Sequence, residues 1–229
     1  MKYRCRLCAE PTPARVRSNI RRFGTSCASS NSMPLRSIRA DRAEHAARLP
    51  GDELIADPIA SMTHAITIQR GPHDVWPWLA QMGAGTRGGW YSYDWLDNNG
   101  QPSADRIRPN LRDIGVGTLF PAMPGVTDGF HVLVCDPVQS LVIGWRPAPR
   151  TSPIMTWAFV LRSLPGNRTR LIVRARGSHD YPFYGLPRFI GQPLIRFAHF
   201  VMERKQLHGI AMRVESQSTA SRGKKREVA

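Results

Sequence analysis

The chain has 229 residues, of which 41% are hydrophobic and 21% are charged, so it is long enough for one folded domain with extensions. No apolar run reaches the roughly 18 to 20 residues that a membrane-spanning helix requires. The formal net charge of +15 divides into +5 over residues 1–60, +4 over 61–185 and +6 over 186–229. Because phosphate binding needs a contiguous basic stripe, this spread favours a protein that does not bind nucleic acid.

Residues 1–33 hold seven basic residues and one acidic residue among many Ser, Pro and Ala. This composition is typical of a transit peptide, and Arg21 and Arg22 before Phe23 are typical of a twin-arginine export signal. The following GTSCASSNSMP lacks the apolar stretch of roughly 7 to 15 residues that secretion requires. We therefore expect either a disordered N-terminus or an over-extended start, with translation beginning at Met33.

The four cysteines do not match a usual metal site. Cys5 and Cys8 form a C-x-x-C pair, but a structural zinc site needs four ligands, and Cys27 and His45 could complete it only at an unusual spacing. Cys135 lies in a predicted strand and is expected to be a small core residue. We expect no metal and no cofactor. Because unpaired thiols suit a reducing compartment, we also expect a cytoplasmic location.

Residues 34–61 are predicted to be a lead-in segment with a short helix over 40–49. From Thr63 onward Ile66 and Ile68 alternate with polar residues, which predicts a strand with one buried face. A helix is predicted next, because a proline suited to the first helical position is followed by one apolar stripe. Its residues are Pro72, Val75, Trp78, Leu79 and Met82.

A glycine-rich loop, GAGTRGG, and an aromatic run, WYSYDWL, follow that helix. Ser92 is placed to cap a second short helix. The loop could be a mobile lip that offers Arg87 to an acidic ligand group, or it could simply be flexible. The aromatic side chains of this run could line the mouth of a pocket or could join the short helices to the sheet; they are Trp90, Tyr91, Tyr93 and Trp95.

Period-two alternation and short turns predict five further strands, at residues 117–122, 130–135, 141–146, 155–162 and 170–176. Hairpin-length connections imply an antiparallel sheet. Arg170, Arg174 and Arg176 alternate along the last strand, and we interpret them as a solvated outer face.

After Pro187 the apolar residues keep helical spacing as far as Val214, which predicts one long helix that covers the sheet. Residues 215–229 are polar, charged and poor in apolar residues, so they are predicted to be a disordered basic tail.

The first strand, followed by VWPWLAQMG and GGWYSYDWLDN, resembles bacterial members of the START-like superfamily, also called SRPBCC, which includes Bet v 1 and polyketide cyclase-like proteins. The resemblance covers residues 62–214. It implies an α+β helix-grip fold, in which a curved antiparallel sheet wraps around a long C-terminal helix and two short helices follow the first strand. It also implies a ligand cavity between the sheet and that helix. It does not assign a catalytic or ligand-binding role to any individual residue.

Our leading hypothesis is the binding or transport of a small hydrophobic or lipid-like ligand in that cavity. The residues expected to bind it are Arg87, Trp90, Tyr91, Tyr93, Trp157, Phe159, Tyr184 and Phe197. One alternative is a polyketide cyclase- or dehydratase-like enzyme that uses His131, His179 or Tyr93 for acid–base chemistry. Another is a regulatory protein-interaction module. The oligomeric state stays open.

Two histidines are candidates for the enzyme alternative, although His131 could equally be a hydrogen-bonded core residue and His179 could simply line an entrance. His131 shares a strand face with Leu133 and Cys135 and is expected to point inward. His179 lies in the loop between the last strand and the long helix, near one end of the expected cavity. Inward polar groups with shifted pKa values would favour the enzyme. A wholly apolar cavity would favour the carrier. A filled interior with an exposed apolar patch would favour the interaction module.

Overall fold

The protein is represented by a computed structural model that describes residues 36–182 and 186–226. The expectations for residues 1–33, including those for Cys5, Cys8 and Cys27, and the expectation for Tyr184 lie outside the described residues.

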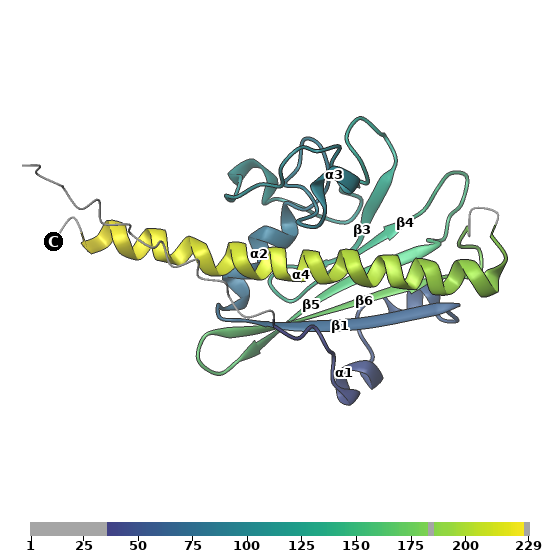
Figure 1. Cartoon of the computed structure of the whole chain (residues 1–229), viewed down its shortest axis with the longest axis horizontal. Coiled ribbons are helices and arrows are strands. Elements are labelled where there is room, and N and C mark those ends of the chain that lie inside the picture. The colour runs from purple at the N-terminus through teal and green to yellow at the C-terminus, as the bar shows by residue number, and fades with distance from the viewer. Residues whose placement is uncertain (1–35, 183–185, 227–229) are drawn as a thin grey trace, which may run out of the picture. The chain divides into compact units, whose positions relative to one another are not determined.

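Six strands form one antiparallel sheet in the order β1-β6-β5-β4-β3-β2 (Figure 1). The strands are β1 (Ala60–Ile68), β2 (Leu119–Pro121), β3 (Gly129–Asp136), β4 (Ser140–Trp145), β5 (Met155–Leu164) and β6 (Arg168–Gly177). The helical elements are α1 (Arg42–Ala46), η1 (Asp52–Ile55), α2 (Pro72–Ala80), α3 (Asp94–Asp97), η2 (Pro109–Leu111) and α4 (Arg188–Arg226). Two short helices after the first strand and one long C-terminal helix on an antiparallel sheet are the helix-grip arrangement, so the predicted α+β fold is confirmed.

The sheet has one face toward α4 and one face away from it. His64, Ile66 and Ile68 of β1 point toward α4, and their cross-strand partners in β6 do the same. Leu207 and Ile210 of α4 are fully buried and belong to the same core. This alternation is the pleat that the sequence predicted.

The outer face of the sheet is covered by the lead-in segment, and the interpretation of its arginines as a solvated face was wrong. Arg170 pairs with Glu44, while Arg174 and Arg176 both pair with Asp52. We call these five residues the polar seam. The side chain of Arg174 is only 4% exposed.

Arg174 has the largest number of acceptors in the polar seam. Its guanidinium donates to Asp52 Oδ2 at 2.7 Å and to Thr63 Oγ1 at 2.9 Å. It also donates to three backbone carbonyls at the end of α1, those of Glu44, His45 and Ala47. Because buried charge is tolerated only when it is paired and hydrogen-bonded, these contacts explain how an arginine can lie under the lead-in segment.

A β-bulge in β3 changes which residues face the core. The register of β3 with β4 shifts between Val132 and Val134. His131 pairs with Gly144, which pairs with Thr156 on the outer face of β5, so the expectation that His131 points inward was wrong. An extra residue in one strand reverses the side-chain faces beyond it, and the sequence pattern does not reveal the bulge.

Helix α4 is longer than predicted, since it continues to Arg226 where the sequence predicted a disordered tail from residue 215. Extending an existing helix needs no new nucleation, which allows it to run past its last apolar contact. Gly209 lies where α4 crosses the loop before α3, and a Cβ atom there would be 2.3 Å from the carbonyl oxygen of Tyr91. Within the described residues, no helix has the length and hydropathy needed to cross a membrane.

Candidate functional site

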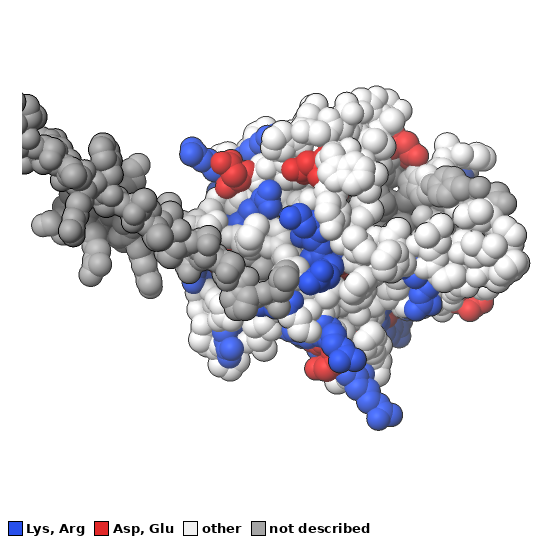
Figure 2. All heavy atoms as spheres, viewed as in Figure 1, with Lys and Arg blue, Asp and Glu red and all other residues white. Residues whose placement is uncertain are grey.

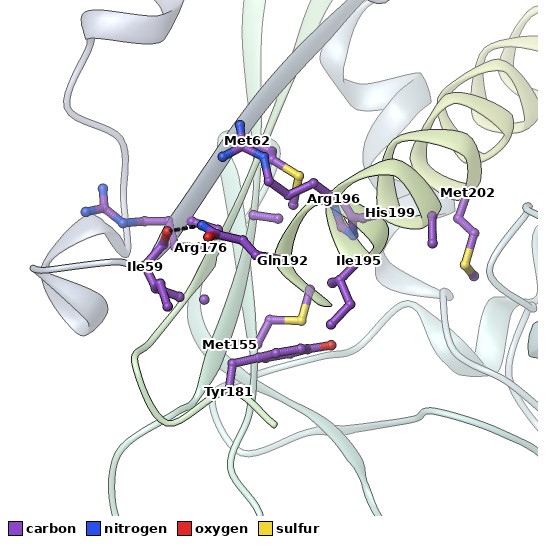
Figure 3. A pocket seen from close by; sticks show the side chains of 14 residues that line it. Ile59, Met62, Met155, Arg176, Tyr181, Gln192, Ile195, Arg196, His199 and Met202 are labelled. Carbon is purple, nitrogen blue, oxygen red and sulfur yellow. Dashed lines mark hydrogen bonds between the residues drawn. The ribbon is translucent and has the colours of Figure 1, made fainter. Parts of the chain in front are cut away.

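A cavity of about 250 Å³ lies between the first half of α4 and the ends of three strands. It is bounded by Met62 of β1, Met155 of β5 and Ala175 of β6 (Figure 3). Residues from α4 form the opposite wall, where Ile195 faces Met155. The complete lining consists of Ile59, Ala60, Met62, Met155, Ala175, Arg176, Gly177, Tyr181, Gln192, Ile195, Arg196, Ala198, His199 and Met202.

The lining of this cavity is mainly apolar, with few polar side chains. Gln192 is held away from the interior because its Nε2 donates to the carbonyl oxygen of Ile59 at 2.8 Å. Arg176 is engaged with Asp52 in the polar seam. His199, Arg196 and Tyr181 are the other lining residues with polar side chains, and His199 lies beside Arg196 on the α4 wall.

His199 is in contact with a buried carboxylate. Its Nε2 lies 3.0 Å from Glu203 Oε2, one helical turn further along α4. The same oxygen accepts a hydrogen bond of 2.8 Å from His64 Nδ1 of β1. We call these three side chains the His64–Glu203–His199 set. It joins helix and sheet at the end of the cavity.

Glu203 is ionised despite being fully buried. Burial alone would raise its pKa, but the contacts with His199 and His64 outweigh burial and hold the pKa of Glu203 below its usual range. The side chain of Glu203 has no exposed surface, whereas those of His199 and His64 are 12% and 17% exposed. The two histidines are therefore the members of the set that other molecules can reach.

Several buried polar atoms near this set have no hydrogen-bond partner among the described residues. They are His199 Nε2, whose approach to Glu203 is an ion-pair contact without hydrogen-bond geometry, and Glu203 Oε1, Gln206 Oε1 and Trp157 Nε1. The ring of Trp157 lies 5.3 Å from that of His199. Buried polar atoms normally find a partner in protein, water or ligand. Of the residues that carry these atoms, only His199 lines the cavity.

Aromatic side chains fill the central part of the space between sheet and helices, where the resemblance had implied a cavity. Trp157 stacks on Trp90 with ring centroids 6.0 Å apart, and it also contacts Phe130 and Phe159. Phe159 is fully buried. The cavity is thus confined to the end where α4 begins.

The aromatic residues after the glycine-rich loop mainly pack in the core. Trp90 is 5% exposed, and its Nε1 donates to the carbonyl oxygen of Ala122 at 3.1 Å. The hydroxyl of Tyr91 donates to the carbonyl oxygen of Trp78, and burial raises the pKa of Tyr91 above its usual range. Tyr93 precedes α3 and packs edge-on against an exposed tryptophan.

The glycine-rich loop is fastened to the body of the protein. Gly83 and Gly89 exchange backbone hydrogen bonds of 3.2 and 2.7 Å. Arg87 donates to the carbonyl oxygen of Met82 at 2.6 Å and lies over the ring of Phe120. Its guanidinium thus binds backbone carbonyl oxygens at the C-terminal end of α2 instead of facing a cavity.

Ser92 does not cap α3, since its hydroxyl donates to the carbonyl oxygen of Met202 on α4.

The remaining predicted residues lie apart from one another. His131 lines a shallow depression on the outer face with Arg146 and Pro149. His179 is exposed, 3.3 Å from Asp57. Phe197 is 66% exposed on the outer side of α4. Among the described residues, none of the predicted catalytic or ligand-binding side chains lines the cavity of about 250 Å³.

His199 and Glu203 were not among the site residues predicted from the sequence. Their spacing of four residues on a predicted helix was the available signal, because such residues lie on the same helix face. His64 could not have been added, since it lies 139 residues away from Glu203 in the chain.

No protein-family model matches the chain, and no curated protein matches it. Similar solved structures include protein MLL2253 from Mesorhizobium loti, with 14% identity, a TM-score of 0.43, and coverage of 69% of this chain and 98% of that one. The polyketide cyclase-like protein Cgl2372 from Corynebacterium glutamicum has 16% identity and a TM-score of 0.43, covering 69% and 92%. The Zhui aromatase/cyclase from Streptomyces sp. R1128 has 14% identity and a TM-score of 0.43, covering 69% and 95%.

Similarity at this level carries no argument about ligand or reaction. The chain has the helix-grip fold, and the solved structures similar to it include polyketide cyclase-like proteins.

Proposed function

We propose that the chain binds a small, mainly apolar ligand in the cavity between the first half of α4 and the ends of β1, β5 and β6. The observation that supports this most directly is the lining, in which Met62, Met155, Ile195 and Met202 surround a space of about 250 Å³. Ligand sites are typically concave and mostly apolar, with a few polar groups that fix orientation.

The size of the cavity limits the ligand. Its volume lies just below the roughly 300 to 1,000 Å³ of typical small-molecule sites, and corresponds to about eight water molecules by liquid volume. It therefore suits a compact molecule or one end of a longer chain. Methionine side chains are unbranched and adaptable, so a lining with three of them can accommodate related ligands of different shapes.

The test is a cavity-filling substitution with a matched control. Gly177 lines the cavity, and a Cβ atom there would meet nothing within 4 Å, so Gly177→Leu should fill the space without a clash. Gly115, in an exposed loop, also has open space and serves as the control. Native mass spectrometry and thermal shift with fatty acids, sterols and aromatic polyketides should show binding to the wild type and to Gly115→Leu, and none to Gly177→Leu. Equal binding by all three proteins would contradict the proposal.

Acid–base catalysis is a second candidate function, and the His64–Glu203–His199 set favours it. A histidine that is oriented by a buried carboxylate and reaches a ligand cavity has the arrangement of a general base. We therefore propose His199 as the candidate base, in place of the sequence-based candidates His131, His179 and Tyr93.

A comparison of the ligand before and after incubation separates the two functions. If wild-type protein changes the mass or absorbance of a bound ligand and His199→Gln binds it unchanged, the protein is an enzyme. If both proteins release the ligand unaltered, the protein is a carrier.

A further inference from the structure

The first half of α4 is apolar on the side that faces away from the sheet as well as on the cavity side. Five large side chains of this half are exposed: Phe189 (79%), Phe197 (66%), Leu194 (54%), Ile190 (47%) and Phe200 (39%), of which Phe200 lies at the margin and also contacts the ring of His64 on β1. We call these five residues the apolar face of α4. From Ile190 to Phe200 they recur at intervals of three and four residues, and Phe189 lies next to Ile190, so together they form one broad stripe along the helix. The second half of the helix differs, because its large apolar residues Leu207, Ile210 and Val214 are buried.

The apolar face of α4 is large for a protein surface. Its three phenylalanines alone expose roughly 370 Å², taking about 200 Å² for a fully exposed side chain. With Ile190 and Leu194 added, the stripe reaches or exceeds the roughly 300 to 600 Å² of the largest patch on a typical monomer. Figure 2 shows a wide area without charged side chains at the end of the protein where α4 begins. A surface of this size indicates a binding partner.

The exposed charges on the first half of α4 itself all have one sign, although Asp57, 3.3 Å from His179, lies near the start of the helix. No acidic residue occurs in the sequence between Asp180 and Glu203, and Glu203 is fully buried. Asp180 is paired with Arg150 at 2.7 Å. The exposed charged residues on the first half of α4 and immediately after it are Arg188, Arg196, Arg204 and Lys205. The partner that complements this stripe is therefore apolar within and negatively charged at its surface.

We propose that the apolar face of α4 docks on the surface of a membrane that contains anionic phospholipid. A helix with phenylalanine and leucine on one side and arginine and lysine at its margins can lie in the plane of the lipid interface. The phenylalanine side chains would enter the boundary between head groups and acyl chains, while the basic side chains would contact lipid phosphates.

A second copy of the chain fits the same stripe less well. Pairing two copies through the apolar face of α4 would bring the basic residues at its margins, Arg188, Arg196 and Arg204, from both copies into one interface. Like charges placed together at an interface disfavour association. A membrane with anionic lipid supplies the opposite charge.

Docking in this way would bring the cavity close to the lipid. The same stretch of α4 carries Ile195 and Met202 toward the cavity and Phe197 away from it. A helix is only about 10 to 12 Å across, so one helix diameter would separate cavity and membrane. The docking proposal does not depend on whether the cavity binds a ligand, and its test uses no ligand.

The test is co-sedimentation of the full chain with vesicles of phosphatidylcholine alone or mixed with phosphatidylglycerol. Wild-type protein should partition more strongly onto the mixed vesicles. Phe189→Glu combined with Phe197→Glu should lower the partition coefficient about 100-fold, because each substitution removes an inserted ring and adds a repelled charge. Val116→Glu, at an exposed apolar position before β2, is the control and should bind like wild type. Both phenylalanines are exposed, so the melting temperature of the double variant should match that of wild type.

Three outcomes would overturn the proposal. Equal partition of wild type and the double variant would mean that basic residues alone carry binding. Absence of partition together with a dimer that the double variant dissociates, seen by analytical ultracentrifugation, would make a second copy the occupant. Absence of both would mean that the apolar face of α4 has no lipid partner.

Discussion

His64 on β1 and Glu203 on α4 are joined by a hydrogen bond of 2.8 Å that spans the interface between sheet and helix. Glu203 is fully buried, and a second histidine, His199, lies 3.0 Å from the same oxygen. An ionised carboxylate in this position is stable only while its partners remain, so it fixes α4 against β1 at one defined register.

Removing the carboxylate of Glu203 should strongly destabilise the protein. Glu203→Ala should lower the free energy of unfolding by about 3 to 5 kcal/mol, because His64 loses its hydrogen-bond acceptor and His199 loses the carboxylate beside it at the interface between helix and sheet. Glu203→Gln should cost less, since the amide oxygen can still accept a hydrogen bond. Urea denaturation measures both, with the exposed Glu53→Gln as control. A Glu203→Ala protein as stable as wild type would mean that the set does not hold helix and sheet together.

Arg174 should not tolerate replacement by lysine. The guanidinium of Arg174 donates to five acceptors, whereas an ammonium group has three donors and lacks the planar fork. We expect Arg174→Lys to lower the free energy of unfolding by about 2 to 4 kcal/mol through unsatisfied buried carbonyls and Asp52. Arg162→Lys, on the exposed part of β5, should change it by less than about 0.5 kcal/mol.

Asp97 should make the protein less stable as pH rises through the range of its titration. Burial, followed by repulsion from Asp94, raises the pKa of Asp97 from its usual 3.8 to about 6. The folded protein therefore holds this proton more tightly than the unfolded chain, so the neutral acid favours folding at low pH. That advantage disappears between about pH 4 and pH 6, and above pH 6 the buried charge destabilises the fold.

The substitution Asp97→Asn isolates this effect. After allowance for solvent contact, the variant should melt roughly 2 to 4 °C higher than wild type above pH 6, corresponding to about 1 kcal/mol, and at nearly the same temperature below pH 4. Differential scanning calorimetry at several pH values measures the difference in melting temperature between the variant and wild type. The other titratable groups are the same in both proteins, so their contributions cancel in this difference. A difference that is constant from pH 4 to pH 7 would assign the effect to something other than titration of Asp97.

Gly209→Ala should destabilise the protein although alanine favours helices. The added Cβ atom would lie 2.3 Å from the carbonyl oxygen of Tyr91, which is part of the backbone and cannot move aside easily. The clash should cost about 1 to 3 kcal/mol after the gain of up to about 1 kcal/mol in helix propensity is subtracted. Met212→Ala on the exposed side of the same helix should be nearly neutral. A Gly209→Ala protein more stable than wild type would show that α4 does not approach that loop so closely.

The fold could be predicted from the sequence because its signals are local. Ile66 and Ile68 alternate with polar residues, and the apolar spacing between Leu194 and Val214 is that of a helix, so each element is visible in its own segment. The relation between Arg174 and the lead-in segment is not local, and the residues that cover it are more than 100 positions away. An alternating row of arginines has the same pattern whether water or a carboxylate faces it.

The candidate site was less predictable than the fold. Trp90 and Tyr91 looked like the mouth of a pocket because large aromatic residues line pockets and cores alike. The structure uses both in the core, and the remaining cavity lies at the end of the sheet, lined by methionine and isoleucine. Such residues carry no functional signal by themselves. The bulge in β3, which turns His131 outward, also has no signature in the alternation pattern.

The polar seam determines how short a fragment of this chain can be while keeping its fold. A fragment that begins at Met62 would keep nearly all of the sheet and α4, yet it would lack Glu44 and Asp52 and leave the guanidinium of Arg174 facing water. Ile172 and Ala65 would also lose the cover of Leu49. In hydrogen exchange, the central amides of β6 should then lose protection together with those of β1, so the lead-in segment belongs to the same cooperative folding unit as the sheet.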